Sequence, residues 1–214
     1  MNKMQRFTDL TSLIDACGQD GSLVDADLTF ADLEGIDLSG MDLSGINFSG
    51  GSLTDVTLDG CMLDHMHAIE CRMTRVSFKH AKLGHALFQK SVMEAVTFAG
   101  ADMTAGSFLI CEMPDTDFRN ARLVKTQFLQ CNLERVDFTS ADLSRGSLRE
   151  SSLEGARFVS TDLRETDFRK TNLHHANYHH VCTDGALFYG KPPWEGEAVS
   201  GRDWHLELVV FDGE

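Results

Sequence analysis

Several features are scarce in this 214-residue chain, and each scarcity excludes something. There are only 3 prolines and aromatic residues make up 8% of the sequence, which favours a regular scaffold over the irregular loops of many enzymes. No apolar run reaches the roughly 18 residues of a transmembrane helix. The N-terminal segment also lacks the apolar core of a secretory signal. We therefore expect a cytoplasmic protein without membrane attachment.

Positive charge is missing from one part of the chain. Between Gly21 and Glu70 there are ten Asp and Glu residues and no Lys or Arg, whereas residues 71–180 carry fifteen Lys and Arg against thirteen acids. The formal net charge of −14 disfavours direct binding to nucleic acid or to an anionic membrane. One end of the molecule is expected to be far more negative than its middle.

The dominant pattern is a period of five. From Leu23 to Phe188 every fifth residue is Leu, Met, Phe or Tyr except at Ala68 and Thr183, which makes 34 units without a shift of register. This period fits neither an α-helix nor a β-strand. It fits a chain that runs briefly extended and then turns a corner in every unit. A smaller residue precedes each large one by two positions, so both are expected to point inward.

Units such as Ala31-Asp32-Leu33-Glu34-Gly35 and Ala141-Asp142-Leu143-Ser144-Arg145 resemble the A(D/N)LXX motif of the pentapeptide-repeat family. The resemblance implies an all-β solenoid: a right-handed quadrilateral parallel β-helix with four units per coil and about eight coils over residues 21–190. Such units bury their apolar side only by stacking. Residues 1–20 are expected to form a short capping helix with Thr8 as its N-cap. Residues 191–214 are expected to form a turn and a strand.

If four units make one coil, residues twenty apart stack on one another. Sorted in this way, the central residues form two columns of Leu and Met, apart from Thr183, and two columns that hold every central Phe. Phe78 and Phe98 belong to one aromatic column, and Phe88 and Phe108 to the opposite one. Four rings in one layer would overfill a narrow interior. The sequence therefore predicts two facing Phe ladders separated by two aliphatic ladders.

No arrangement typical of an enzyme is found. A nucleophile–base pair, a phosphate-binding glycine loop and a metalloprotease motif are all missing, so we predict no catalytic residue and no cofactor. Four cysteines occupy the small inward position and are interpreted as packing residues, although the last two are close enough for a disulfide: Cys61, Cys71, Cys111 and Cys131. Four histidines share an outer corner without carboxylates at ligand spacing, so no metal site is predicted: His174, His175, His179 and His180.

Acidic residues of the first coils form the first candidate partner-binding surface. We call it the acidic band, and it consists of Asp25, Asp27, Asp32, Glu34, Asp37, Asp42, Asp55, Asp59 and Asp64. In the family that the chain resembles, quinolone-resistance proteins are rods whose shape and negative surface imitate duplex DNA. The resemblance thus implies a protein partner such as DNA gyrase or topoisomerase IV. Because the repeat itself specifies Asp at many of these positions, a merely solvated face is the open alternative.

The second candidate surface is an apolar row at outward positions. Ile69, Leu109 and Leu129 share this row, and Ile110 lies beside it. Stacked exposed aliphatic side chains favour a contact site. The alternative is that the N-terminal helix or the C-terminal strand folds back over them.

The C-terminal segment supplies a third set of residues. Residues 203–211 alternate apolar and polar side chains as a strand does. A cap on the last coil or a homodimer contact is expected from Trp194, Trp204, Leu206, Leu208 and Val210. The function predicted from the sequence is a non-enzymatic protein-binding scaffold, most specifically a DNA-mimic rod acting on a gyrase-type topoisomerase. The alternative is an adaptor or assembly factor, for example of a secretion or effector system, that binds through the apolar row and the C-terminal tail.

Overall fold

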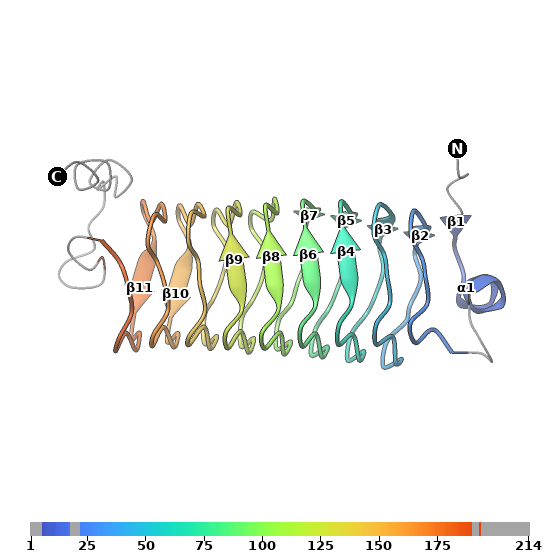
Figure 1. Cartoon of the computed structure of the whole chain (residues 1–214), viewed down its shortest axis with the longest axis horizontal. Coiled ribbons are helices and arrows are strands. Elements are labelled where there is room, and N and C mark those ends of the chain that lie inside the picture. Colours follow the sequence, from blue (N-terminus) through green and yellow to red (C-terminus); the bar gives the residue numbers. More distant parts are fainter. Residues whose placement is uncertain (1–5, 18–21, 190–192, 194–214) are drawn as a thin grey trace.

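The chain forms a column of stacked coils (Figure 1). The structure is a computed structural model that describes residues 6–17, 22–189 and 193. In the pairings within the column each residue lies beside the residue twenty positions later, as Leu33 lies beside Leu53 and Leu53 beside Met73. The fold is thus a parallel β-solenoid with four five-residue units per coil. At twenty residues per coil, residues 22–189 make about eight coils.

Short parallel strands line three sides of the column. One sheet contains β1 (Arg6–Phe7), β2 (Asp32–Glu34), β3 (Ser52–Thr54), β5 (Arg72–Thr74) and β7 (Val92–Glu94). A second contains β4 (His67–Ile69), β6 (Leu87–Gln89), β8 (Ser107–Leu109) and β9 (Gln127–Leu129), and a third contains β10 (Arg157–Val159) and β11 (Asn177–His179). Single bridges such as that of Asp42 with Met62 continue the ladder on the fourth side.

Each corner has the same backbone conformation. Two residues after every large inward residue, from Asp25 to Gly185, φ is positive. Glycine fills 8 of these positions and non-glycine residues fill 25. A left-handed conformation costs a non-glycine residue roughly 1–2 kcal/mol. The neighbouring coil offsets this cost by accepting the corner N–H, as when Arg75 donates to the carbonyl of Glu94 at 2.8 Å.

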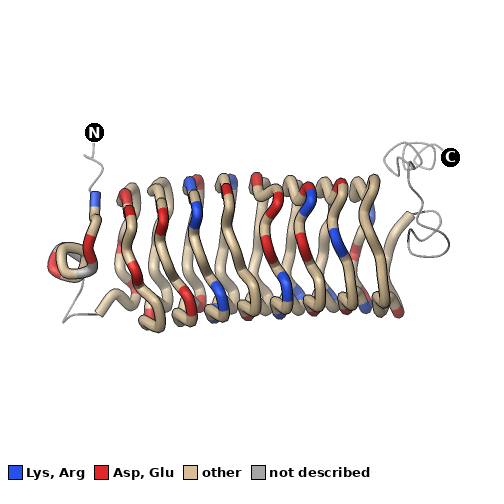
Figure 2. Tube along the Cα trace, turned by 180° about the vertical axis from the view of Figure 1, so that it is seen from behind, with Lys and Arg blue, Asp and Glu red and all other residues tan. Residues whose placement is uncertain are grey.

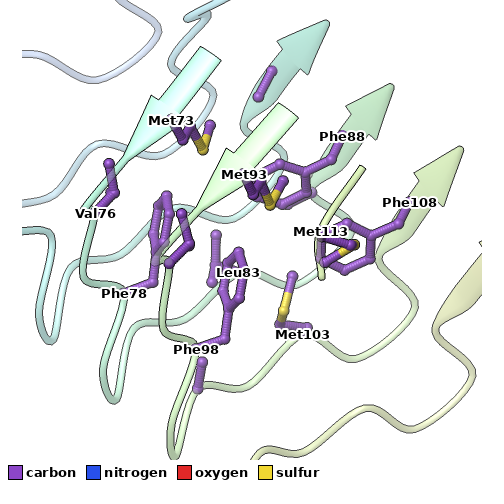
Figure 3. Packing of buried hydrophobic residues seen from close by; sticks show 14 of the residues in the cluster. Met73, Val76, Phe78, Leu83, Phe88, Met93, Phe98, Met103, Phe108 and Met113 are labelled. Atoms are coloured by element: carbon purple, nitrogen blue, oxygen red, sulfur yellow. The ribbon is translucent and has the colours of Figure 1, made fainter. Parts of the chain in front are cut away.

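The interior has the predicted alternation of ladders (Figure 3). Phe98 stacks between Phe78 and Phe118 with ring centroids 4.8 and 5.0 Å away. On the opposite side, Phe88 and Phe108 stack at 4.7 Å. The two ladders meet edge to face, with Phe98 and Phe108 at 5.8 Å. Burial of each ring contributes about 1.5–3 kcal/mol, and the ring geometry is the favourable one for aromatic pairs.

Polar side chains at the small inward position are hydrogen-bonded inside the column. Thr126 donates through Oγ1 to the carbonyl of Met103 at 2.7 Å, and Thr166 donates in the same way to Leu143 at 2.9 Å. Both acceptors lie 23 residues earlier, in the preceding coil. Buried hydroxyls are tolerated here because they have partners. Four cysteines at this position are buried free thiols, which agrees with a packing role: Cys61, Cys71, Cys111 and Cys131.

At the N-terminal end, β1 contacts β2 of the first coil, and α1 (Leu10–Cys17) contacts β1 and buries Leu13 in the core. β1 adds a strand to the edge of β2, a pairing that sequence reasoning missed. The expected N-cap was wrong: Asp9, not Thr8, caps the helix by accepting the backbone N–H of Ser12 at 2.8 Å. A carboxylate satisfies a helix N-terminus well. Within the described residues no helix is long and apolar enough to cross a bilayer.

The C-terminal end is described as far as Tyr189, and again at Pro193. Phe188 packs, partly buried, against the core. Pro193 is buried and lines a pocket together with Phe168, Lys170 and Tyr189. The predicted C-terminal strand, residues 203–211, lies outside the described residues.

Candidate partner-binding surfaces

The acidic band lies at outward positions on all four sides of the first coils. Figure 2 shows Asp and Glu without Lys or Arg on these coils, and both signs mixed further along the column. Outward placement follows from the alternation of the extended segments, since the residues on either side of each inward side chain point to solvent. Asp37 and Asp42 are exposed, whereas their neighbours Leu38 and Leu43 are fully buried.

Three carboxylates of the band bind the residue two positions on. Asp37 accepts the backbone N–H and the hydroxyl of Ser39, at 2.9 and 2.5 Å. Asp42 accepts the same groups of Ser44 at 3.1 and 2.7 Å, and Asp27 has the equivalent arrangement. The hydroxyl and the backbone hydrogen bond lower the pKa of all three carboxyls, which therefore stay ionised at neutral pH.

The other carboxylates of the band contact another coil or β1. Arg75 donates from Nε and Nη2 to both oxygens of Asp55, at 2.6 and 2.7 Å, and this hydrogen-bonded pair lowers the pKa of Asp55. Asp59 accepts the backbone N–H of Lys79 at 2.9 Å. The remaining four are placed as follows: Asp32 accepts from Ser52, Glu34 pairs with Arg6, and Asp25 and Asp64 lie against Gly45 and Gly84. The band is thus part of the repeat's own hydrogen bonding as well as a charged surface.

Basic residues of the later coils are paired along the column. Arg135 holds Asp115 with two contacts of 2.7 Å, and these residues are twenty apart. The same spacing joins Lys90 to Glu70 at 3.6 Å. Exposed pairs of this kind add only about 0–1 kcal/mol each, but they cancel charge locally. The excess negative charge therefore stays with the first coils. The twenty-residue spacing of opposite charges was the sequence signal that would have revealed these pairs.

The apolar row lies on the second sheet in the predicted register. Ile69, Gln89, Leu109 and Leu129 follow one another along β4, β6, β8 and β9. Leu129 is 38% exposed and Ile110 is 48% exposed, whereas Ile69 and Leu109 are partly buried. Helix α1 lies at the N-terminal end of the column and does not cover this sheet (Figure 1).

Two other sequence expectations concern histidines and the tail. The rings of His174 and His175 lie 3.8 Å apart, and His174 Nδ1 is 3.8 Å from Glu154. Among residues 6–17, 22–189 and 193, no three His, Cys, Asp or Glu side chains are grouped so that they could hold a metal ion. The five tail residues expected to form a cap or dimer contact lie outside the described residues: Trp194, Trp204, Leu206, Leu208 and Val210.

Comparisons with known proteins agree with this architecture. A family model described as pentapeptide repeats (8 copies) matches residues 22–64, 71–108 and 147–177, and a second, pentapeptide repeat region, matches residues 92–158. No curated protein matches the sequence significantly.

Two solved structures share the fold. One is HetL from the cyanobacterium Nostoc sp. strain PCC 7120, a pentapeptide repeat protein involved in heterocyst differentiation regulation. It is 19% identical over 87% of this chain and 88% of HetL, with a TM-score of 0.55. The other is a trypsin-treated form of QnrB1, a plasmid-mediated fluoroquinolone resistance protein. It is 16% identical over 86% of this chain and 90% of QnrB1, with a TM-score of 0.50. Identities this low establish the fold alone.

Proposed function

Because the chain belongs to the pentapeptide-repeat family, we propose that it is a non-enzymatic scaffold that binds a protein partner through the side chains on its column. The more specific proposal is that the partner is a gyrase-type topoisomerase, DNA gyrase or topoisomerase IV, in a bacterial cytoplasm. The acidic band would occupy a surface that otherwise receives duplex DNA. The fluoroquinolone resistance of QnrB1, which has the same fold, is consistent with this choice.

The observation that carries the proposal is the density of charge on the first coils. Residues 21–70 hold ten carboxylates and no Lys or Arg over two and a half coils, which is about 12 Å of column at about 4.8 Å per coil. Duplex DNA carries about one charge per 1.7 Å, or about seven over the same length. Three of the ten are paired with a base: Glu34 with Arg6, Asp55 with Arg75 and Glu70 with Lys90. The other seven match the charge density of DNA, whereas residues 71–180 hold more Lys and Arg than acids and do not. The proposed contact is confined to the N-terminal third.

A supercoiling assay with purified gyrase, in the presence and absence of a quinolone, tests the proposal. The expected result is inhibition of supercoiling, or protection of gyrase from the quinolone, that weakens as the salt concentration rises. No inhibition and no protection at a high molar excess of the protein would refute the topoisomerase proposal.

Matched variants locate the contact. Asp42→Asn with Asp64→Asn removes two charges from the band and is expected to weaken inhibition. Asp102→Asn with Asp142→Asn removes two charges from later coils, on the side of the column that carries Asp42. This control pair is expected to leave the inhibition of gyrase unchanged. Equal effects of the two double variants would contradict a contact at the first coils.

A second candidate function is favoured by the apolar row. The exposure of Leu129 on β9 and of Ile110 at the corner after β8 suits an adaptor or assembly factor that binds its partner by apolar contact. Affinity capture with the native chain and with the Leu109→Asp, Leu129→Asp variant separates the two cases. A partner retained by a folded variant does not use the row.

A further inference from the structure

Phe30 is an exposed aromatic residue among the carboxylates of the first coils. It lies at the corner between the segments that carry Asp27 and Asp32, and its φ is +62°. It is 50% exposed, the largest fraction among the large apolar residues that the structure describes. The other corners between residues 25 and 70 carry Gly, Asp, Glu or His. Single exposed apolar residues are common on protein surfaces, so the groups around the ring decide what it can bind.

The ring of Phe30 lies against the next coil. Gly50 occupies the same corner one coil further on, and a Cβ atom there would lie 2.4 Å from Cε1 and 2.5 Å from Cδ1 of Phe30. Carbon atoms that are not bonded prefer separations of about 3.5–4.0 Å, so the ring occupies space that only a glycine leaves free. This contact holds the ring on one side, while half of the residue stays open to solvent. A ring held in this way loses little conformational entropy when it binds a ligand.

The charges nearest to Phe30 in the chain are negative. Asp27 lies on the side of the column that carries the second sheet, and Asp32 begins β2 on the adjoining side. The hydroxyl and the backbone N–H of Thr29 lower the pKa of Asp27, which therefore stays ionised at neutral pH. Asp32 accepts a hydrogen bond from the hydroxyl of Ser52. Hydroxyl groups are neutral, so they leave the negative charge of both carboxylates in place.

Carboxylates of the acidic band already bind guanidinium groups within the chain. Arg75 donates from Nε and Nη2 to both oxygens of Asp55, at 2.6 and 2.7 Å. Arg6 of β1, which comes from outside the repeat, pairs with Glu34. Glu34 is at the end of β2 that is farther from Phe30 along the chain. An arginine on a segment outside the repeat can therefore dock on these coils.

An aromatic ring beside carboxylates is complementary to arginine. The guanidinium group stacks on aromatic faces, and its N–H groups fit carboxylate oxygens two at a time. Lysine has the same charge but lacks this planar fork. A purely apolar partner would have to remove water from Asp27 and Asp32 without pairing them, which is costly. The occupant that fits this corner is therefore a basic segment that presents arginine.

We propose that Phe30, together with Asp27 and Asp32, binds an arginine side chain of the partner protein. This inference rests on the proposed function, because it accepts that the partner contacts the first coils. It goes further by naming the type of side chain that the partner presents and the aromatic residue that receives it. The site does not require the partner to be a topoisomerase.

Fluorescence anisotropy at low ionic strength tests the site with a labelled peptide of alternating Gly and Arg and with a Gly–Lys peptide of equal length. The native chain is expected to bind the Arg peptide more tightly. Phe30→Leu keeps an apolar side chain without the ring, and is expected to weaken binding of the Arg peptide about two- to fivefold. Phe30→Tyr keeps the ring and is expected to bind like the native chain. Ile110→Ala, at a corner outside the acidic coils that is 48% exposed, is expected to change neither affinity.

The other outcomes overturn the proposal. Binding of neither peptide means that the first coils hold no site for a basic segment. Equal affinities for the two peptides, or an affinity for the Arg peptide that a folded Phe30→Leu variant retains, mean that charge alone attracts them. An equal loss in Ile110→Ala means that exposed apolar side chains bind the peptide without regard to the carboxylates.

The supercoiling assay gives a separate answer. A chain that binds the Arg peptide through Phe30 and leaves gyrase unaffected refutes the topoisomerase as partner, and the arginine site stands. Inhibition of gyrase that Phe30→Leu does not weaken, together with unchanged peptide binding, refutes the arginine site alone.

Discussion

Replacement of Phe98 by alanine tests whether the aromatic ladder holds the column together. Phe98 is fully buried, with two stacked neighbours at 4.8 and 5.0 Å and two edge-on neighbours, Phe88 and Phe108, at 5.8 Å. Removal of a buried Phe costs about 3–5 kcal/mol. Because four ring contacts are lost together and each contributes about 0.5–1.5 kcal/mol, we expect the upper half of that range.

Urea unfolding followed by far-ultraviolet circular dichroism measures this loss. Total stabilities of domains are about 5–15 kcal/mol, so the variant is expected to fold with a clearly lower midpoint. Phe30→Ala is the matched control, since Phe30 is 50% exposed and should cost below about 1 kcal/mol. A loss below about 1 kcal/mol for Phe98→Ala, or one equal to that of Phe30→Ala, would refute the assignment of the ring to the core.

Three further predictions concern the backbone, the carboxylates and the thiols. Gly51→Ala is expected to lower the unfolding midpoint more than Gly60→Ala, because a Cβ at Gly51 would lie 2.4 Å from the Ala31 carbonyl oxygen, whereas Gly60 has open space and only its φ of +67° to strain. The free energy of unfolding is expected to fall as pH drops below about 4, and to fall less in the Asp162→Asn variant. The Arg164 hydrogen bonds lower the pKa of Asp162 in the folded state. The stabilisation by Asp162 is therefore complete above its unfolded-state pKa and is lost as pH falls through its folded-state pKa. In a Cys17→Ser, Cys182→Ser variant, a thiol reagent is expected to react only after denaturation, because the remaining cysteines are buried and burial raises the pKa of Cys71 to about 11.

Each of these has a measurement that can contradict it. Equal midpoints for the two glycine variants in thermal unfolding would place Gly51 away from the preceding coil. A thermal midpoint that stays constant from pH 6 to pH 3, a window chosen around the ordinary carboxyl pKa of about 4, would contradict the role given to Asp162 and its neighbours. Rapid labelling of the native cysteine variant would show that the inward thiols are accessible.

The sequence by itself determined the fold and most of the interior. A period of five that never shifts leaves few ways to bury the large residues, and the confinement of Phe to two of four columns fixed twenty residues per coil. Phe98 could be assigned to a ladder facing Phe108 before any coordinates, because volume per layer permits no other arrangement. The outward rows, including the row from Ile69 to Leu129, follow from the same spacing of twenty residues per coil.

Only the tertiary structure decided which side chains and which strand edges meet, because the five-residue period does not encode these contacts. The pairing of β1 with β2 comes from an open sheet edge, which accepts a strand whose sequence has no repeat. Side-chain reach placed Arg75 on Asp55, a member of the acidic band, and Arg135 on Asp115 within the later coils. The repeat fixes the position of each Cα atom on the column, whereas the contacts between side chains depend on how the coils stack.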